Sequence, residues 1–355
     1  MRGIKCTGPG KAQIDPNTPL PLLKPGYCLV RVAAVALNPT DFKHIDHVAT
    51  ETGYNHTCGC DYAGTVVSAP PDNIKNLKPG DRIAGFIHGM KAEEPSSGAF
   101  AGYAAAKVGL QVRIPDNVSF EDAAGLPTGI NTVGQSLYES MGLQPWPGKG
   151  KGTGEWILIY GGSTGMGMYA IKFAKLSGVK VVTTCSGRNF EKVKNLGADA
   201  VVDYSKGEED CVRGIKEVAG EHLKYAMDCV SNESSAKICA GALTKEKGVA
   251  KYRCLLPLEF PRDDVDFAFT LGYSAVGEEY SFFGQKIVPT EGNWKFSREW
   301  WALAEELLAE GKLTPAPYRN GDGGLEGVLE GLDDLRKGRV SGEKLVYRID
   351  EGEGE

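Results

Sequence analysis

The stretch that most constrains the fold runs from Trp156 to Lys175. It opens with the apolar run Trp156-Ile-Leu-Ile-Tyr160, turns through Gly161-Gly-Ser-Thr-Gly-Met-Gly167, and resumes with apolar residues at helical spacing. Strand, glycine-rich turn and helix in this order predict a dinucleotide-binding corner, where the backbone approaches a pyrophosphate at a helix N-terminus. Thr164 replaces the second glycine of the G-x-G-x-x-G motif, and its hydroxyl can still donate to a phosphate. The other interpretation is a glycine-rich turn without a ligand.

The end of the next apolar run indicates which dinucleotide is bound. Residues 179–184 lead into Ser186, Gly187, Arg188 and Asn189. Enzymes that prefer the cofactor without a 2′-phosphate place Asp or Glu about 20 residues past the glycines, to accept from the ribose hydroxyl. Here only hydroxyl, guanidinium and amide donors follow the strand, with Lys192 one helical turn further on, and these groups favour a 2′-phosphate. The sequence therefore predicts NADPH; in a second interpretation, compatible with the first, Ser186 or Asn189 caps the following helix.

Length and composition narrow the class of protein. A chain of 355 residues is long enough for two domains, each with its own core. A net charge of −6 without a basic block argues against a nucleic-acid binder. The N-terminus does not have the pattern of a signal peptide, and no apolar run reaches the roughly 18 residues of a membrane span. Nine scattered cysteines fit free thiols in a reducing cytoplasm.

The order of predicted elements gives an α/β fold. Residues 1 to 125 read as β-rich, with a long strand over 27–37, and residues 120–142 switch to helix. From residue 155 strands and helices alternate, which is typical of a doubly wound parallel sheet with crossover helices. A last strand of this sheet is expected within 267–276. Helices over 297–310 and 324–336 and a strand over 345–349 close the chain and are expected to pack back on the first domain.

Several motifs in the same order resemble those of the medium-chain dehydrogenase/reductase superfamily. They are Leu37-Asn-Pro-Thr-Asp41, Gly59-Cys-Asp-Tyr-Ala-Gly64, Lys78-Pro-Gly-Asp-Arg-Ile83, Gly98-Ala-Phe-Ala-Gly-Tyr103, Ala124-Gly-Leu-Pro127, the turn at 162–167, and Gly338-Arg-Val-Ser-Gly-Glu-Lys-Leu345. The resemblance implies a GroES-like domain over 1–128, with 296–355 packing back on it, and a Rossmann cofactor domain over 129–295. Within the superfamily, the sequence is most similar to fungal trans-acting enoyl reductases, the separate partners of highly reducing polyketide synthases of the lovastatin type. The stretches that carry this narrower resemblance are 127–135, 186–190, 203–204 and 271–275.

Many members of the superfamily hold a catalytic zinc through Cys and a Gly-His-Glu motif. The corresponding positions here read Asn38-Pro39-Thr40 and Cys60-Asp61, and no cluster of four cysteines follows Gly85. His44, His47 and His56 lie nearby in the sequence, so binding of some metal by these histidines is the alternative interpretation. The prediction is an enzyme without zinc, which favours reduction of an activated C=C bond over alcohol dehydrogenation.

The resemblance implies NADPH-dependent reduction of the α,β-double bond of a polyketide enoyl thioester. Hydride addition at the β-carbon leaves an enolate that needs stabilisation and then a proton on the α-carbon. Lys43 is the expected proton donor, with a solvated surface lysine as the alternative interpretation; solvent, Tyr54 or Tyr62 remain open as donors. Thr128, Asn131 and Thr132 are expected to hydrogen-bond the thioester carbonyl, unless they cap or satisfy local backbone.

The remaining site residues are also implied by the resemblance. The expected cofactor residues are Asp41, Lys43, His44, Ser163, Thr164, Gly165, Met166, Ser186, Gly187, Arg188, Asn189, Tyr204, Val340 and Ser341. Tyr204 is expected to pack on the adenine, or else to be a core tyrosine. The expected substrate residues are Thr128, Gly129, Ile130, Asn131, Thr132, Val133, Gly134, Gln135, Leu271, Gly272, Tyr273, Ser274 and Ala275.

The expected partner is a polyketide synthase that presents the chain on the phosphopantetheine arm of an acyl carrier domain. Possible basic contacts to that acidic domain are Lys149, Lys151, Lys245, Lys247, Lys251 and Arg253. A monomer is expected, because the charged, proline-containing run 257–266 would blunt the edge strand that relatives use to dimerise. Two other functions stay open: a free-standing zinc-independent quinone or enone reductase, and a cofactor-binding partner protein without catalysis.

Overall fold

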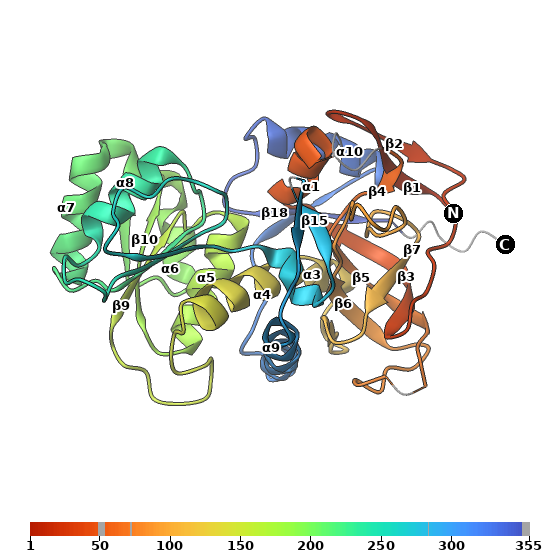
Figure 1. Cartoon of the computed structure of the whole chain (residues 1–355), viewed down its shortest axis with the longest axis horizontal. Coiled ribbons are helices and arrows are strands. Elements are labelled where there is room, and N and C mark those ends of the chain that lie inside the picture. The colour runs from red at the N-terminus through yellow and green to blue at the C-terminus, as the bar shows by residue number, and fades with distance from the viewer. Residues whose placement is uncertain (49–53, 72, 283, 350–355) are drawn as a thin grey trace. The chain divides into compact units, whose positions relative to one another are not determined.

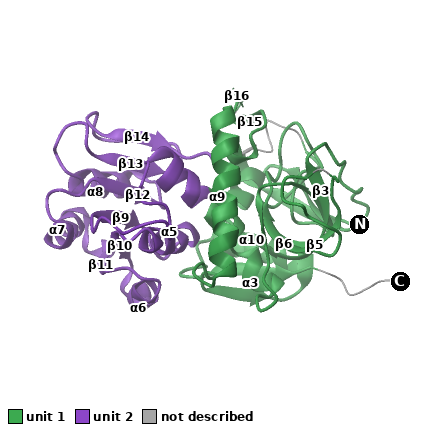
Figure 2. Cartoon of the chain, turned by 90° about the horizontal axis from the view of Figure 1, so that it is seen from below, with its two compact units in different colours: residues 1–131, 273–355 green, residues 132–272 purple. Residues whose placement is uncertain are grey.

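The chain folds into two compact units. The computed structural model describes residues 1–48, 54–71, 73–282 and 284–349. Unit 1 comprises residues 1–131 and 273–355, and unit 2 comprises residues 132–272 (Figure 2).

Unit 1 is built on a seven-stranded, mostly antiparallel sheet. Its strand order is β17-β18-β3-β5-β6-β8, and β7 also pairs with β3. A smaller sheet has the order β2-β1-β4. The strands are β1 Gly3–Gly8, β2 Lys11–Asp15, β3 Tyr27–Ala36, β4 His56–Thr57, β5 Asp61–Ser68, β6 Arg82–Phe86, β7 Tyr103–Lys107, β8 Gln111–Arg113, β15 Tyr280–Phe282, β16 Gln285–Ile287, β17 Tyr318–Gly321 and β18 Lys344–Arg348. The helices are α1 Pro39–Lys43, α3 Phe120–Ala124, α9 Glu291–Ala309 and α10 Gly324–Arg336, and α4 Pro127–Val133 begins in this unit.

The end of the chain completes the sheet of unit 1, as the sequence predicted. Strand β18 pairs antiparallel with β3, with Val346 opposite Ala36, and α10 packs beside α1 (Figure 1). The apolar side chains of β3 and β18 enter one buried cluster, which includes Val32, Val35 and Leu345. Burying these β-branched and aliphatic side chains together is what makes the last residues part of the first unit.

Unit 2 is a doubly wound parallel sheet. Its six strands run in the order β11-β10-β9-β12-β13-β14, and every pair is parallel. The strands are β9 Trp156–Tyr160, β10 Lys180–Cys185, β11 Ala200–Asp203, β12 Tyr225–Asp228, β13 Lys251–Cys254 and β14 Asp266–Phe269; the helices are α5 Gly165–Leu176, α6 Phe190–Asn195, α7 Glu208–Ala219 and α8 Glu233–Ala242. This arrangement confirms the Rossmann fold and places the glycine-rich turn where the strand order reverses.

Two helical stretches differ from the sequence expectation. In the region 120–142, two helical pieces were predicted, over 122–127 and 131–141; instead α3 ends at Ala124, α4 begins at Pro127, and residues Gly134–Ser140 form a π-helix. Proline lacks a backbone N–H and suits a first helical turn, so the break falls before it. Helix α9 starts at Glu291, six residues earlier than predicted, because Thr290 caps it by accepting from the amide of Asn293.

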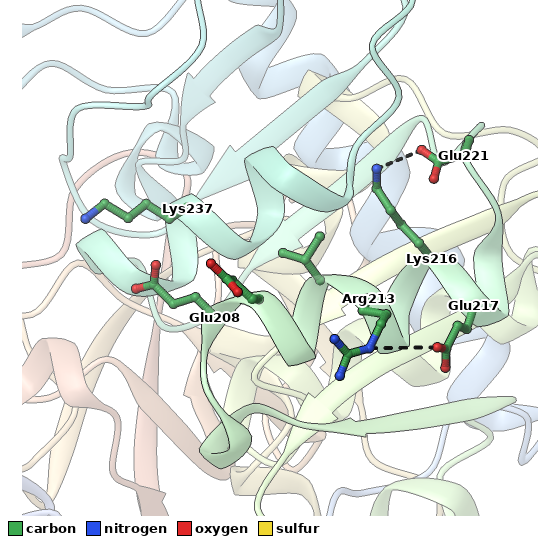
Figure 3. A pocket seen from close by; sticks show the side chains of 8 residues that line it. Glu208, Arg213, Lys216, Glu217, Glu221 and Lys237 are labelled. Carbon is green, nitrogen blue, oxygen red and sulfur yellow. Dashed lines mark hydrogen bonds and ion pairs between the residues drawn. The ribbon is translucent and has the colours of Figure 1, made fainter.

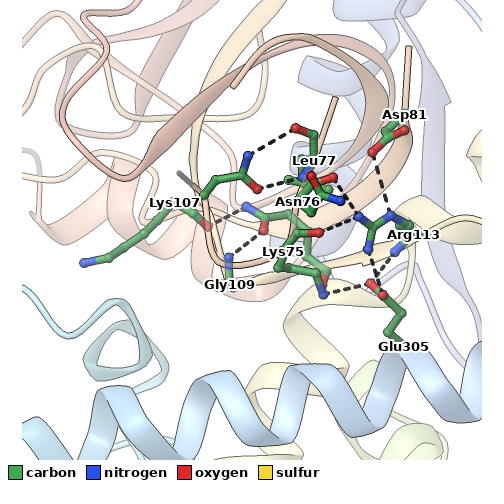
Figure 4. A network of polar contacts seen from close by, with 10 residues as sticks. Lys75, Asn76, Leu77, Asp81, Lys107, Gly109, Arg113 and Glu305 are labelled. Carbon is green, nitrogen blue, oxygen red and sulfur yellow. Dashed lines mark hydrogen bonds and ion pairs between the residues drawn. The ribbon is translucent and has the colours of Figure 1, made fainter. Parts of the chain in front are cut away.

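Helix α9 is held on unit 1 by buried aromatic and charged side chains. Trp300 and Trp301 are buried, and the Trp300 indole donates to the carbonyl of Ile130 at 2.8 Å. Glu305 accepts from the Arg113 amide at 2.8 Å and pairs with Lys75 at 2.7 Å (Figure 4).

The boundary between the units differs from the expected one. Residues 273–295 were predicted to belong to the cofactor domain, and they belong to unit 1; the first crossing falls after residue 131 instead of 128. Glu278 provides the physical reason. Its carboxylate accepts from the Tyr27 hydroxyl at 2.7 Å and pairs with Lys107 at 2.8 Å and Lys91 at 3.1 Å. This cluster ties the segment to β3 and β7.

Glu278 makes the attachment of this segment sensitive to acid. Burial disfavours the carboxylate, yet hydrogen bonds from Lys107 and Tyr27 and the two ammonium charges hold its pKa at about 2, below the ordinary value of 4.5. A carboxyl whose pKa is depressed by folding stabilises the protein above its unfolded pKa and loses that contribution as the pH falls toward its folded pKa. We expect Glu278→Gln to lower the free energy of unfolding at pH 7 by roughly 1–2 kcal/mol after solvent screening, and the deficit to shrink between pH 4.5 and 3. Urea titrations across that range measure it.

The neighbouring residue is a matched control. Glu279 pairs with Lys286 at 2.6 Å, but both side chains are more than half exposed. Glu279→Gln should change the free energy of unfolding by less than about 0.5 kcal/mol at any pH. Equal deficits for both variants would show that the Glu278 cluster does not hold the segment.

Candidate active site

The glycine-rich turn of unit 2 requires glycine at three positions. A Cβ on Gly162 would lie 2.0 Å from the Thr183 hydroxyl oxygen, and one on Gly167 would lie 2.2 Å from the carbonyl oxygen of Gly161. Gly161 itself has a φ of +79°, which other residues rarely adopt. These close approaches let β9 turn directly into α5 and bring bare backbone to the start of that helix, so the residues fit a bound pyrophosphate.

Thr164 caps the helix, and its hydroxyl is already engaged. It donates to the carbonyl of Gly161 at 2.8 Å and accepts from the amide of Gly167 at 3.0 Å. The expected donation from this hydroxyl to a phosphate is therefore replaced by a capping role. The amides of Gly165 and Met166 occupy the first helical positions, where no intrahelical acceptor exists, and Ser163 is half-buried beside them. These groups remain for an anion.

The expected cofactor residues 186–189 lie directly after β10. Ser186 is half-buried, Gly187 and Arg188 are exposed, and Asn189 is buried. Ser186 and Asn189 occupy the N-cap positions of the 3-10 turn Gly187–Asn189 and of α6, but neither makes a side-chain capping hydrogen bond. Among the described residues, Arg188 has no carboxylate partner. The sequence did not reveal that Asp203 lies alongside: it is opposite Cys185 in the neighbouring strand, and its Oδ2 lies 3.9 Å from where a Cβ of Gly187 would be.

Tyr204 is an exposed side chain. It follows β11, is 45% exposed, and its ring centroid lies 6.4 Å from that of Tyr160. The core interpretation is therefore wrong, and the ring is available to a ligand. The ends of β9, β10 and β11 thus bring Ser163, Arg188 and Tyr204 to the same edge of the sheet.

Two of the expected basic contacts of unit 2 are structural. Lys251 donates to the carbonyl of Met141 at 2.9 Å. Arg253 is 2% exposed, pairs with Asp266 at 2.9 Å and donates to the carbonyl of Ser140 at 2.7 Å. Their charges are used within the unit, whereas Lys149, Lys151, Lys245 and Lys247 are exposed.

In unit 1, α1 and the π-helix that follows it at His44–Val48 carry three expected site residues. Asp41 is buried, its Oδ2 accepts from the Asn38 amide at 2.7 Å, and its Oδ1 has no hydrogen-bond partner. Burial is the main reason that the Asp41 pKa rises to about 7. Lys43 is half-buried, which lowers the pKa of its ammonium, and it has no ion pair among the residues that the structure describes. His44 is buried, and burial lowers its pKa to about 4, so the ring is neutral at neutral pH.

Asp61 is the centre of a buried polar network that the sequence did not reveal. Lys344 pairs with it at 3.1 Å, and both side chains are at most 3% exposed. Asn38 donates to the same oxygen of Asp61 at 2.8 Å and accepts from Lys344 at 2.8 Å. The other oxygen of Asp61 accepts from the amide of Thr128 at 2.8 Å and from its hydroxyl at 2.5 Å.

This network changes the role of Thr128. A carboxylate is a stronger acceptor than a thioester carbonyl, so the Thr128 hydroxyl proton is committed to Asp61. The predicted bond to the substrate carbonyl is thus replaced by one that fixes the start of α4. Asn131 is buried, and its side-chain oxygen lies 3.4 Å from the indole nitrogen of Trp301. Of the expected substrate residues 128–135, only Thr132 is more than slightly exposed.

The second expected substrate segment contains a buried hydroxyl. Tyr273 lies 2.6 Å from the Thr40 hydroxyl and 3.1 Å from Nε2 of His44, and its ring stacks on His88 with centroids 3.9 Å apart. Ser274 bonds Tyr280 at 3.0 Å, Ala275 is buried, and Leu271 and Gly272 are half-buried. Val340 and Ser341 are half-buried before β18.

The two tyrosines that were expected as other donors differ in their exposure. Tyr62 is fully buried in the core of unit 1, which raises its pKa well above the usual range, whereas Tyr54 is exposed. No three His, Cys, Asp or Glu side chains among the described residues are arranged to hold a metal ion. No helix in the described part of the chain is long and apolar enough to cross a bilayer.

A hollow of about 680 Å³ lies on the surface of unit 2, and its lining is charged. Its residues are Glu208, Glu209, Val212, Arg213, Lys216, Glu217, Glu221 and Lys237 (Figure 3). Lys216 pairs with Glu221 at 2.7 Å, and Arg213 lies 4.0 Å from Glu217. The lining includes none of the predicted site residues, so the hollow is not the candidate site.

Family models match both units. The zinc-binding dehydrogenase family matches residues 165–250, and the alcohol dehydrogenase GroES-like domain matches residues 24–116. Solved structures share the fold at low identity. They include an alcohol dehydrogenase superfamily protein from Novosphingobium aromaticivorans (TM-score 0.78, 22% identity, 99% of this chain and 100% of that one) and the CurK enoyl reductase (TM-score 0.75, 18% identity, 98% and 99%).

Relatives of higher identity cover the whole chain. The trans-enoyl reductase resD of Aspergillus sclerotiorum is 43% identical across 98% of this chain and 100% of its own length. The trans-enoyl reductase ACTTS2 of Alternaria alternata is 40% identical across 98% of this chain and 99% of its own. Identity at this level over both units establishes kinship. The chain belongs to the fungal trans-enoyl reductases of the medium-chain dehydrogenase/reductase superfamily.

Proposed function

We propose that this chain is a trans-acting enoyl reductase that uses NADPH to reduce the α,β-double bond of a polyketide chain held as a thioester on the acyl carrier domain of a polyketide synthase. The observation that carries the proposal is full-length similarity to trans-enoyl reductases. Cofactor binding is supported by the glycine-rich turn and by the free amides of Gly165 and Met166. When bound, NADPH supplies the hydride to the β-carbon of the thioester.

The preference for NADPH rests on charge at the end of β10. Arg188 is exposed and has no carboxylate partner within the described residues, and Ser186 adds a hydroxyl that does not cap the helix. A guanidinium and a hydroxyl bind a dianionic phosphate well. Asp203 is the opposing charge: its Oδ1 accepts from the amide and hydroxyl of Ser205, at 2.9 and 2.7 Å. We propose that the attraction of a 2′-phosphate to Arg188 exceeds its repulsion by Asp203.

Lys43 is the proposed proton donor to the α-carbon. Partial burial lowers the pKa of its ammonium, which makes it a better acid than a solvated lysine. No carboxylate among the described residues competes for its protons. Tyr62 is excluded by its burial, and the Thr128 hydroxyl is occupied by Asp61.

The proposed partner surface is acidic, because acyl carrier domains are, and the exposed Lys149, Lys151, Lys245 and Lys247 suit it. We propose a monomer in the cytoplasm. All nine cysteines are free, which suits a reducing compartment. The charged Asp266 lies at the start of edge strand β14 and disfavours pairing of this edge with another sheet.

The alternative function is a free-standing quinone or enone reductase. Quinone oxidoreductases such as that of Coxiella burnetii share the fold (TM-score 0.72, 21% identity, 98% of this chain and 99% of that one), so the fold does not distinguish the two functions.

Substrate choice separates them. We expect the purified protein to oxidise NADPH with a crotonyl-type thioester of pantetheine and much less with a free enone or a quinone, because the pantetheine arm contributes binding. Absorbance of NADPH follows the reaction. Fast turnover of the quinone with an inert thioester would support the alternative. Tight NADPH binding without any turnover would support a partner protein without catalysis.

The charge of Arg188 at the end of β10 predicts a preference for NADPH over NADH. We expect Arg188→Ala to raise KM for NADPH about tenfold and to leave KM for NADH nearly unchanged, because one charge-assisted hydrogen bond is worth about 1.5–3 kcal/mol. Asp203→Asn is the matched control on the neighbouring strand and should maintain or strengthen the NADPH preference. A loss of preference in the Asp203 variant and not in the Arg188 variant would contradict the assignment.

If Lys43 donates the proton, its replacement should lower kcat. We expect Lys43→Ala to lower kcat about a hundredfold, in line with general acid catalysis, with a smaller change in KM for NADPH. Lys43→Arg should not restore kcat, since a guanidinium is too weak an acid. Lys78→Ala, a surface lysine of the same unit, is the control. A loss of less than about threefold in Lys43→Ala would assign the proton to solvent.

A further inference from the structure

Tyr273 joins Thr40 and His44 through its hydroxyl, deep in unit 1. The hydroxyl lies 2.6 Å from Oγ1 of Thr40 and 3.1 Å from Nε2 of His44. The other nitrogen of His44, Nδ1, lies 3.3 Å from the carbonyl oxygen of Gly89. Tyr273 and His44 are at most 6% exposed, so water does not substitute for these partners, whereas Thr40 is half-exposed.

The partners fix the direction of each hydrogen bond. A carbonyl oxygen only accepts, so Nδ1 of His44 must carry the proton that it shares with Gly89. In a neutral imidazole Nε2 is then an acceptor, and Tyr273 must donate to it. A phenol has a single proton, so its oxygen can only accept from Thr40. The Thr40 proton therefore points to Tyr273, and the Tyr273 proton points to His44.

Neighbouring side chains hold the three hydrogen-bonded residues in place. The Tyr273 ring stacks on His88 at an interplanar angle of 15° and lies 6.1 Å from Tyr280. The Cys60 thiol also contacts the Tyr273 hydroxyl, and because burial raises the pKa of Cys60 well above its usual range, it contributes only as a weak neutral group. A histidine that stays neutral keeps Nε2 as an acceptor throughout the neutral pH range.

We propose that Tyr273 is a positioning residue that turns the Thr40 hydroxyl into a hydrogen-bond acceptor. Thr40 lies three residues before Lys43 and four before His44, so the three share one face of α1 and its junction with the π-helix His44–Val48. With its proton engaged by Tyr273, Thr40 offers only oxygen lone pairs, which bind an O–H or N–H group of a ligand or an ammonium. It cannot donate to a thioester carbonyl or an enolate, so the donor to that oxygen must be another group. The proposal rests on the proposed reductase function.

The tautomer of His44 tests the proposal without catalysis. Long-range ¹H–¹⁵N spectra of protein labelled at its five histidines, assigned with a His44→Gln variant, should show His44 protonated at Nδ1 and bare at Nε2 at pH 7. Tyr273→Phe should shift the Nε2 resonance, because its donor is removed while the stacked ring is kept. Tyr280→Phe, which removes a buried hydroxyl bonded to Ser274 in the same cluster, should leave it unchanged. A proton on Nε2 in the wild type would overturn the proposal, whether or not the protein reduces an enoyl thioester.

The kcat values of single and double variants test whether the hydrogen bond between Tyr273 and Thr40 matters for the reaction. We expect Tyr273→Phe and Thr40→Val each to lower kcat about tenfold, the worth of one buried hydrogen bond, and the double variant to lose about tenfold and not a hundredfold, since both act through the same oxygen. Tyr280→Phe should retain kcat within about twofold. The positioning role would be overturned if the double variant lost about a hundredfold in kcat, or if Tyr273→Phe left kcat unchanged. An equal loss of kcat in Tyr280→Phe would overturn it as well. An inactive wild type would instead contradict the reductase function and leave the tautomer to decide.

Discussion

The buried ion pair of Asp61 and Lys344 holds together the parts of unit 1 that carry its chemistry. Asp61 is the first residue of β5 and Lys344 the first of β18, Asn38 ends the segment between β3 and α1, and Thr128 lies in the first turn of α4. Burying a charge pair is costly unless each oxygen and proton finds a partner, and here both carboxylate oxygens do. Removing one member would leave the other charge buried, at a cost of about 3–5 kcal/mol. The arrangement of α1, with Thr40 and Lys43, depends on this network.

Unit 2 rests on a steric constraint instead. The turn from β9 to α5 passes so close to Thr183 and to its own backbone that side chains at 162 and 167 have no room. The result is a helix start with exposed amides at the reversal of strand order, which is where doubly wound sheets bind anions. Thr164, the residue that departs from the glycine motif, caps α5 and supports that turn through both hydrogen bonds of its hydroxyl.

The elements that were predicted from the sequence are those with a local, periodic pattern. The strand at 156–160, its glycine turn, the alternation that follows and the long strand starting at Tyr27 were all predicted close to their observed bounds. Contacts between residues far apart in the chain were not predicted. The resemblance gave Thr128 a role in substrate binding, and nothing local reveals its bond to Asp61, 67 residues away. Residues 273–295 were assigned to the cofactor domain because the contacts of Glu278 with Tyr27 and Lys107 have no sequence pattern. Lys251 and Arg253 were read as surface charges for the same reason.

The sequence by itself determined the class of fold and the cofactor-binding corner, because backbone conformation, glycine requirement and periodic burial are encoded in neighbouring residues. Its kinship with trans-enoyl reductases follows from its motifs and from its identity to those relatives. Tertiary structure alone decided which hydroxyls are free. The Thr128 hydroxyl donates a hydrogen bond to Asp61, and the Thr164 hydroxyl donates to the carbonyl of Gly161. In the proposed direction, the Thr40 hydroxyl donates to Tyr273, whose own hydroxyl donates to His44. A hydroxyl has one proton, and which acceptor receives it depends on groups that only folding brings within 3 Å or so of it.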